Sequence, residues 1–294
     1  MYDFTIIGNN FREHTPRRLI EEAEKAGLTI QKILFRDLDF VIDDAGARVL
    51  HVGHNGHKGE ELIPSRIAIM RLAGFPQRQF LVNWFNSRGG YVLNQEVYLK
   101  WGYLDKITQT FKMQQAGVPF VPTRIVSSDK RLGANSDFPY IMKHFLSSKG
   151  QDVLKITEEG QASELIPSKY KARKMLVQPF LPGGEDIRVV VLGGKAIGGM
   201  KKKAADGQFL TNFSAGGSVE AYDLAQDTEA KEIAERVAET FGAEYGGVDL
   251  MRDRSGKWKV LEINNNCQFE GFEKSTGINV AKTTIDYLQQ KTSV

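Results

Sequence analysis

Three oxygen-bearing side chains near the C-terminus are the residues best suited to chemistry. Asp249 stands near the end of one predicted strand, and Glu262 and Asn264 stand two residues apart on the next, so the latter two share a face. Antiparallel pairing would bring that strand back beside Asp249. Two carboxylates and an amide oxygen at one spot suit Mg²⁺, which completes its shell with water and substrate phosphates. The alternative is a solvated sheet face with ordinary polar residues, and the pattern alone leaves both open.

Lysines and a small polar loop form a second group. Lys143 ends the apolar segment YIMK, and HFLSSKGQD follows it, small and polar around Ser148 and Gly150. Such a loop can close over phosphates and donate backbone N–H groups to them. Lys106 opens the predicted helix that follows Gly102. The alternative for a lysine at a strand end is a solvated edge.

The segment LVQPFLPGGEDIR runs from an apolar strand into a Pro-Gly turn, which favours a hinge between two lobes. Its backbone could pair with the flat edge of a ligand, and Asp186 just beyond could accept hydrogen bonds from ribose hydroxyls. The alternative is an interdomain linker with an exposed acid. The run GMKKKA then places Lys202 and Lys203 at a strand end, one hairpin from the predicted metal site. A charge run is more often a solvated face.

The first hundred residues offer candidates for substrate binding. Asn9 follows the first predicted strand, where open α/β sheets tend to bind ligands. Arg66 in IPSRIA is expected at a comparable position, from which it could pair with a substrate carboxylate; the alternative is surface solvation. His51, His54 and His57 suggest zinc, but they alternate with glycines in a predicted turn and fit an exposed hairpin better.

The periodicity of the chain predicts the elements that must position these groups. An apolar strand over 3–7, a helix capped by Thr15 with Pro16 at its first position, and a second strand open an α/β unit. Further helices are expected over 105–117 and 228–242, and a last one runs through NVAKTTIDYLQQ. Strong hairpin signals lie at Gly193-Gly194 and at residues 254–256.

Composition sets limits on the class of protein. The chain has 294 residues, 41% of them hydrophobic, which is typical of a soluble globular protein. Its 39 basic and 36 acidic side chains give a net charge of +3, too balanced to indicate a nucleic-acid or membrane partner. Cys267 is the single cysteine, so no intrachain disulfide can form. No apolar run reaches the roughly 20 residues that cross a bilayer. We therefore expect a complete, cytoplasmic chain.

The order of these segments resembles one enzyme superfamily. ATP-grasp enzymes carry a set of short motifs in a fixed order, and this chain has similar segments in the same order. They are DK at 105–106, IMK ending at Lys143, LVQPF with EDIR, GGMKKKA, FLTN, GVDLM and LEINNN. The tail FEGFEKSTGINVA is similar to the RimK-like branch, whose founding member adds glutamates to a ribosomal protein C-terminus. The resemblance covers nearly the whole chain and is strongest over residues 105–281.

The resemblance implies an α/β fold of three subdomains, with the nucleotide between the central and C-terminal ones. We expect an N-terminal α/β domain over 1–102, a central subdomain over 103–180 and a C-terminal subdomain over 181–294. It implies a ligase that uses ATP and Mg²⁺, or Mn²⁺, to join a carboxylate to an amine through an acyl phosphate. The substrate would be an amino acid, a peptide or a protein C-terminus. The alternatives are an enzyme that crosslinks or modifies a ribosomal peptide and a non-catalytic ATP-binding regulator. Homo-oligomer formation rests on family habit alone.

The resemblance also implies roles at matching positions. They are nucleotide contacts at Lys106, Lys143, Ser148, Gly150, Gln178, Pro179, Phe180, Asp186 and Asn212, metal ligands at Asp249, Glu262 and Asn264, and groups near the transferred phosphate at Arg188, Lys202 and Lys203. Two segments depart from the family pattern. The run at 214–217 is Ser-Ala-Gly-Gly in place of the usual Arg-Gly-Gly, and Asn266-Cys267-Gln268 replaces a Ser-Pro-Gly-like stretch. Since the second segment lies near the acceptor in the family, substrate identity is the least transferable inference.

Overall fold

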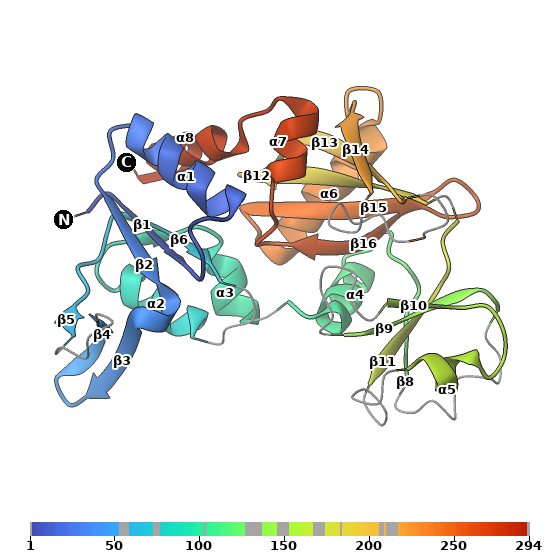
Figure 1. Cartoon of the computed structure of the whole chain (residues 1–294), viewed down its shortest axis with the longest axis horizontal. Helices are drawn as coiled ribbons and strands as arrows, with labels where there is room; N and C mark the ends of the chain where they lie inside the picture. The colour runs from blue at the N-terminus through green and yellow to red at the C-terminus, as the bar shows by residue number, and fades with distance from the viewer. Residues whose placement is uncertain are drawn as a thin grey trace.

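The computed structural model describes residues 2–52, 59–72, 77–102, 104–126, 137–145, 153–166, 174–182, 184–205, 209 and 217–292. Within them the strands form four sheets, one in each predicted subdomain and a small extra one near the N-terminus (Figure 1). In the same residues, no helix is both long and apolar enough to span a bilayer.

The N-terminal sheet is parallel and has the strand order β2-β1-β6-β7. All five residues of β1 are buried, because helices cover both faces of the sheet. α1 packs on one face, and α2 and α3 pack on the other. The elements of this sheet and its helices are β1 (Phe4–Gly8), α1 (His14–Lys25), β2 (Ile30–Leu34), β6 (Ile67–Arg71), α2 (Arg78–Asn86), β7 (Tyr91–Val92) and α3 (Gln95–Trp101). Between β2 and β6 lie a short helix, η1 (Phe35–Asp37), and an antiparallel sheet of β3 (Leu38–Asp43), β4 (Gly46–His51) and β5 (Glu60–Glu61).

The start of α1 differs from the prediction. Thr15 was expected to cap the helix, but the helix already begins at His14, and Glu13 precedes it without a side-chain cap. The Thr15 hydroxyl is buried and instead accepts a hydrogen bond from the amide of Phe269, 3.2 Å away. Pro16 still lies in the first turn, where its missing N–H leaves no intrahelical bond unmade. The Thr15 hydroxyl, which the local sequence predicts as a helix cap, therefore makes a tertiary hydrogen bond instead.

The central subdomain contains an antiparallel sheet of order β10-β9-β11-β8 with its own small core. Its elements are α4 (Lys106–Gln115), β8 (Arg124–Val126), β9 (Tyr140–His144), β10 (Val153–Ile156), α5 (Gln161–Leu165) and β11 (Met175–Pro179). Asp105 caps α4, since its Oδ1 accepts hydrogen bonds from the amides of Ile107 and Thr108 at 2.8 and 3.0 Å. This cap fixes Lys106 as the first residue of the helix.

The C-terminal subdomain is built on a five-stranded antiparallel sheet of order β14-β13-β12-β15-β16. Both predicted hairpins are confirmed, with β12 joined to β13 at Gly193-Gly194 and β15 joined to β16 across residues 253–257. The elements are β12 (Glu185–Leu192), β13 (Lys195–Lys203), β14 (Ser218–Tyr222), α6 (Thr228–Phe241), β15 (Tyr245–Arg252), β16 (Trp258–Asn264), α7 (Glu270–Thr276) and α8 (Val280–Thr292). α6 covers one face of this sheet, and the core between them is apolar.

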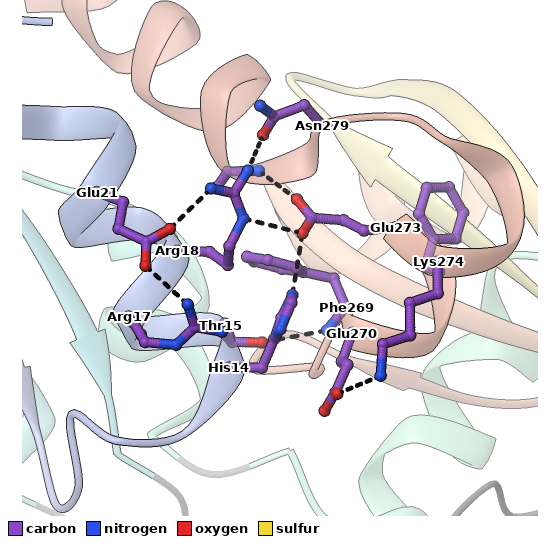
Figure 2. A network of polar contacts seen from close by, with 12 residues as sticks. His14, Thr15, Arg17, Arg18, Glu21, Phe269, Glu270, Glu273, Lys274 and Asn279 are labelled. Atoms are coloured by element: carbon purple, nitrogen blue, oxygen red, sulfur yellow. Dashed lines mark hydrogen bonds and ion pairs between the residues drawn. The ribbon is translucent and has the colours of Figure 1, made fainter. Parts of the chain in front are cut away.

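Polar contacts fasten the N-terminal domain to the C-terminal subdomain (Figure 2). Arg18 of α1 donates from Nε to Glu273 of α7 at 3.3 Å and from Nη2 to Asn279 at 3.0 Å. His14 Nε2 lies 3.0 Å from the same Glu273 carboxylate. α1 and α8 also lie side by side (Figure 1). The two domains therefore share one packed boundary.

A second contact joins these domains beside the sheet. Asn94 donates from Nδ2 to the carbonyl oxygens of Tyr245 and Asn265 at 2.8 and 2.9 Å, and its Oδ1 accepts from the Tyr245 amide at 2.9 Å. One buried amide side chain thus holds the start of β15 and the loop after β16 together.

We predict that Glu22 of α1 makes stability depend on pH in the acid range. Hydrogen bonds from Lys25 and Arg18, at 2.8 and 3.0 Å, hold the pKa of Glu22 down to about 2, against an ordinary value of 4.5. Because the folded pKa is lowered, this stabilisation is present above about pH 4.5 and is lost as the pH falls toward about 2. Glu22→Gln should lower the free energy of unfolding by about 1 kcal/mol at neutral pH.

The measurement is urea unfolding of both proteins at neutral pH and near about pH 3. The difference between them should shrink at the lower pH as the wild-type carboxylate takes up its proton. An equal difference at both pH values would contradict the assignment.

Candidate active site

Cross-strand register places a row of charged residues on one face of the C-terminal sheet. Arg188 of β12 lies opposite Asp249 of β15, and Asp249 lies opposite Glu262 of β16. Paired residues of an antiparallel sheet share a face, and neighbours along a strand alternate between faces. The adjacent pair Val189 and Val248 packs in the apolar core with α6. The charged row therefore occupies the face that α6 does not cover.

Four charged side chains form a network around Asp249. Arg188 donates to its carboxylate from Nε and Nη2 at 2.8 and 2.7 Å, and Lys202 Nζ lies 3.3 Å from Oδ2. Lys202 also pairs with the buried Asp186 at 2.6 Å. Burial alone would raise the pKa of Asp249, but the charges of Arg188 and Lys202 outweigh it and lower that pKa to about 2. Two anions and two cations thus balance inside the sheet face.

Glu262 receives cations from the central subdomain. Lys106, the first residue of α4, places Nζ 3.1 Å from the Glu262 carboxylate. Lys143 of β9 also interacts electrostatically with Glu262. Burial lowers the pKa of Lys143 to about 8; the negative charge of Glu262 opposes this shift, and the positive charge of Lys106 adds to it. The central subdomain therefore directs two cations at Glu262 of the C-terminal sheet.

The predicted metal ligands offer oxygen donors only. Asn264 lies opposite Gly247 and so on the same face as Asp249 and Glu262, and its Oδ1 accepts from the amide of Asn266 at 3.0 Å. Across the described ranges, His, Cys, Asp and Glu side chains form no group of three that could hold a metal. Two carboxylates with an amide oxygen nevertheless fit Mg²⁺, which takes few protein ligands. Arg188 engages both oxygens of Asp249, but a carboxylate carries about four acceptor sites.

Lys203 does not join this group. It lies opposite Glu185, and its Nζ is 3.2 Å from Glu220 and 3.8 Å from Glu185. Because neighbouring residues on a strand point to opposite faces, Lys202 reaches Asp249 while Lys203 points away. Lys203 therefore lies on the other face from Asp249, and the predicted role of Lys202 near the transferred phosphate stays a prediction.

Arg66 is also displaced from its expected position. β1 and β6 run parallel, with Phe4 beside Ile67 and Gly8 beside Arg71. Arg66 precedes β6, so it lies at the amino end of the sheet, where Nη2 donates to the carbonyl oxygen of Thr292 at 3.2 Å. Asn9 follows β1 at the opposite, carboxyl end. The prediction for Arg66 was wrong because it assumed that a strand ends at this residue, whereas one begins after it.

Arg71, at the carboxyl end of β6, was not among the residues predicted to form the site. Its Nη2 donates to the carbonyl oxygens of Asn266 and Cys267, at 3.2 and 3.1 Å, in the loop that follows β16. The signal was present in the sequence, since an arginine ends the apolar run IAIMR just as Lys143 ends YIMK. Arg71 thus joins the carboxyl end of the N-terminal sheet to the loop after β16.

Several groups of the segment Gln178 to Phe180, which was expected to contact adenine, already have partners within the protein. Gln178 is buried, and the amide of Phe180 donates to the carbonyl oxygen of Pro139 at 3.3 Å, so that N–H is not open to a ligand in this structure. The Phe180 ring is covered by Lys155, whose Nζ lies 4.1 Å from the ring centroid. The ring of Phe209 approaches it edge-on at 6.5 Å.

Several candidates lie outside the described residues. They are Ser148, Gly150 and Asn212 of the predicted nucleotide contacts, the 214–216 part of the Ser-Ala-Gly-Gly run, and His54 and His57 of the histidine triplet. Their predicted roles stay predictions.

An N-terminal α/β domain, two further subdomains and a charged sheet face between the last two define a protein of the ATP-grasp class. Comparison with known sequences agrees, because the RimK-like ATP-grasp domain matches residues 107–288. A probable alpha-L-glutamate ligase of Psychromonas ingrahamii is 30% identical over 97% of this chain and 94% of its own length. One from a Marinomonas species is 27% identical over the same shares. The chain belongs to the RimK-like ATP-grasp family, and the predicted class, an ATP-dependent ligase, is confirmed.

Solved structures share the fold at lower identity. The ATP-grasp ligase PsnB, complexed with a phosphomimetic variant of its minimal precursor, Mg and ADP, has a TM-score of 0.74 and 17% identity, covering 99% of this chain and 100% of that one. The RimK domain protein ATP-grasp of Sphaerobacter thermophilus has a TM-score of 0.68 and 18% identity, with coverage of 97% and 98%. The macrocyclase MdnB of Microcystis aeruginosa has 0.66 and 14%, with coverage of 98% and 99%. The predicted fold is confirmed.

Proposed function

We propose that this chain is a carboxylate–amine ligase that binds ATP with Mg²⁺ between its central and C-terminal sheets. The observation that carries the proposal is the position of Glu262. It lies in register with Asp249 on the face that α6 leaves uncovered, and it is met by Lys106 and Lys143 from the central subdomain. Carboxylates on one side and lysines on the other suit a metal-bound triphosphate.

The proposed reaction has two steps. A carboxylate oxygen of one substrate attacks the γ-phosphorus of ATP, the bond from that phosphorus to the bridging oxygen breaks, and ADP leaves. The amine of the second substrate then attacks the acyl carbon, the bond from carbon to the phosphate oxygen breaks, inorganic phosphate leaves and the amine loses a proton. Bound Mg²⁺ would neutralise the phosphates, with Asp249, Glu262 and Asn264 as its ligands. Lys143 and Lys106 would steady the phosphate oxygens, and Arg188 with Lys202 would hold Asp249 in place.

The relatives suggest two substrate classes. The curated ones are named alpha-L-glutamate ligases and align over nearly the whole chain at 27 and 30% identity. This supports glutamate, free or at the end of a peptide, as the first candidate. Solved neighbours include PsnB with its precursor peptide PsnA2 and MdnC with its precursor peptide MdnA, so modification of a ribosomal peptide is the second. A purely regulatory ATP-binding role would leave the charged row on β12, β15 and β16 without a use.

The test uses hydroxylamine in place of the unknown amine. Purified protein is incubated with ATP, Mg²⁺, hydroxylamine and one carboxylate at a time, including L-glutamate and peptides with acidic C-termini. A ligase should release ADP and form a hydroxamate in equal amounts with at least one acid, because hydroxylamine captures an acyl phosphate. Binding of ATP without carboxylate-dependent ADP release from any acid would favour the regulatory alternative.

We predict that nucleotide affinity falls above about pH 8 because of Lys143. Its pKa is lowered to about 8 by burial, so the free protein loses this positive charge as the pH rises through that value. The measurement is the dissociation constant of a non-hydrolysable ATP analogue with Mg²⁺ from about pH 7 to about pH 9.5. Lys143→Arg keeps its charge throughout and should show a flatter curve. Parallel curves for the two proteins would contradict the prediction.

A further inference from the structure

Two arginines from different domains flank the loop after β16. Arg71 comes from the carboxyl end of the N-terminal sheet and holds the carbonyl oxygens of Asn266 and Cys267. Arg188 comes from the C-terminal sheet, where its guanidinium pairs with Asp249. A Cβ atom placed on Gly247 would lie 3.1 Å from both Arg188 Nε and Cys267 Sγ, so both side chains lie close to this glycine.

The hydroxyl of Tyr245 lies at the same loop. It donates to the carbonyl oxygen of Cys267 at 3.2 Å. Burial raises the pKa of Tyr245, and the charges of Arg71 and Arg188 both oppose that rise. Asn264, a proposed metal ligand, is only two residues before Asn266, a span of at most about 7 Å. Arg188 therefore contacts one proposed metal ligand, Asp249, and Arg71 holds the loop that follows another, Asn264.

The two arginines differ in their partners. Arg188 is matched by the carboxylate of Asp249 in a bidentate pair. Arg71 contacts two neutral carbonyl oxygens through Nη2, and in the described part of the chain no carboxylate forms an ion pair with it. Those two bonds anchor its side chain without neutralising it. They leave Nε and Nη1 as donors for a carboxylate.

We propose that Arg71 binds a carboxylate of the substrate that is not consumed in the reaction, and so selects an acidic amino acid or peptide. This rests on the proposed ligase function. The reacting carboxylate must keep its charge to attack phosphorus, and a guanidinium paired with it would weaken it as a nucleophile. A second carboxylate gains from an ion pair with Arg71, because the pair positions the substrate at the carboxyl end of the parallel sheet, beside Asn9 and the loop after β16.

The test compares an acid with its amides. The probes are L-glutamate, L-glutamine and L-isoglutamine, each with ATP and Mg²⁺ and with the amine or hydroxylamine that supports turnover. If another acid supports ADP release, that acid and its amides are used instead. Wild-type protein should prefer the diacid over the amide that lacks the recognised carboxylate. Arg71→Gln should raise KM for the diacid by about 10-fold or more, leave KM for ATP unchanged and remove the preference for acid over amide.

Controls separate recognition from loop support. Arg66→Gln, at the opposite end of the same strand, should change neither KM nor the preference. Arg71→Lys keeps the charge without the several N–H donors of a guanidinium and should give an intermediate preference, and it decides the matter if Arg71→Gln fails to fold. An unchanged preference in the Arg71 variants, or a rise in KM for ATP with the preference intact, would overturn the inference while the ligase function stands. Absence of ADP release from wild-type protein with any acid would overturn both.

Discussion

Replacing Glu262 with glutamine should lower carboxylate-dependent ADP formation by about 100-fold or more, because a metal ligand and the charge opposite two lysines are lost together. Glutamine keeps the shape of the side chain, and Glu262 is 29% exposed, so the fold should survive. Lys106 would lose its anionic partner 3.1 Å away, and Lys143 would lose the charge that opposes its burial. The loss should therefore appear in catalysis and nucleotide binding before it appears in stability.

The matched control lies on the same sheet. Glu220→Gln removes an equally charged carboxylate on β14, which pairs with Lys201 and Lys203 on the opposite face from Glu262. Its rate of ADP formation should stay within about 2-fold of wild type, since exposed ion pairs contribute little. If Glu262→Gln retained more than half of the wild-type rate, the metal site would have to lie elsewhere.

Replacing Asp249 with asparagine should have a different result, a large loss of stability together with loss of activity. The carboxylate is buried and bonded to Arg188 through both oxygens, with Lys202 at 3.3 Å. Its removal leaves the largely buried Arg188 and the buried Lys202 with only Asp186 to balance them. Breaking a buried ion pair by removing one partner costs about 3–5 kcal/mol, and we expect Asp249→Asn to fall in that range. Urea unfolding followed by circular dichroism measures it.

A second substitution separates the structural role of Asp249 from its catalytic role. The double variant Asp249→Asn with Arg188→Met removes the unmatched guanidinium and should recover part of the lost stability, because these neighbours are not additive. It should recover no activity, since the proposed metal ligand is still missing. A double variant as unstable as the sum of its single changes would show that the two side chains do not stabilise each other.

The relation of Asp249, Glu262 and Asn264 could be predicted because it depends on short-range geometry. Alternation along one strand puts Glu262 and Asn264 on one face, and a tight hairpin returns that strand to Asp249. What could not be predicted is how these charges are balanced in the free protein. Arg188 and Lys202 reach Asp249 from two other strands, and Lys106 reaches Glu262 from a different subdomain. Those contacts depend on sheet order, which no local pattern specifies.

The predictions for Lys203 and Arg66 differ from the structure because both depend on where strands begin and end and on which strands pair. The run Lys201 to Lys203 alternates between faces, but only the pairing with β12 decides that Lys202 points toward Asp249. Arg66 and Arg71 border the same five-residue strand, and a shift in its assumed limits exchanges their places at the two ends of the sheet. Side-chain type was a sufficient guide to the chemistry, whereas position required the neighbouring strands.

The central claim is that this site activates a carboxylate by phosphorylation, and transfer of oxygen-18 tests it most directly. The acid that supports ADP release is labelled in both carboxylate oxygens and turned over with unlabelled ATP, in unlabelled water, with its amine. The inorganic phosphate is then analysed by mass spectrometry or phosphorus NMR. An acyl phosphate predicts one labelled oxygen in each phosphate released, in equal amount to the amide formed. Unlabelled phosphate, or release of AMP and pyrophosphate, would contradict the account.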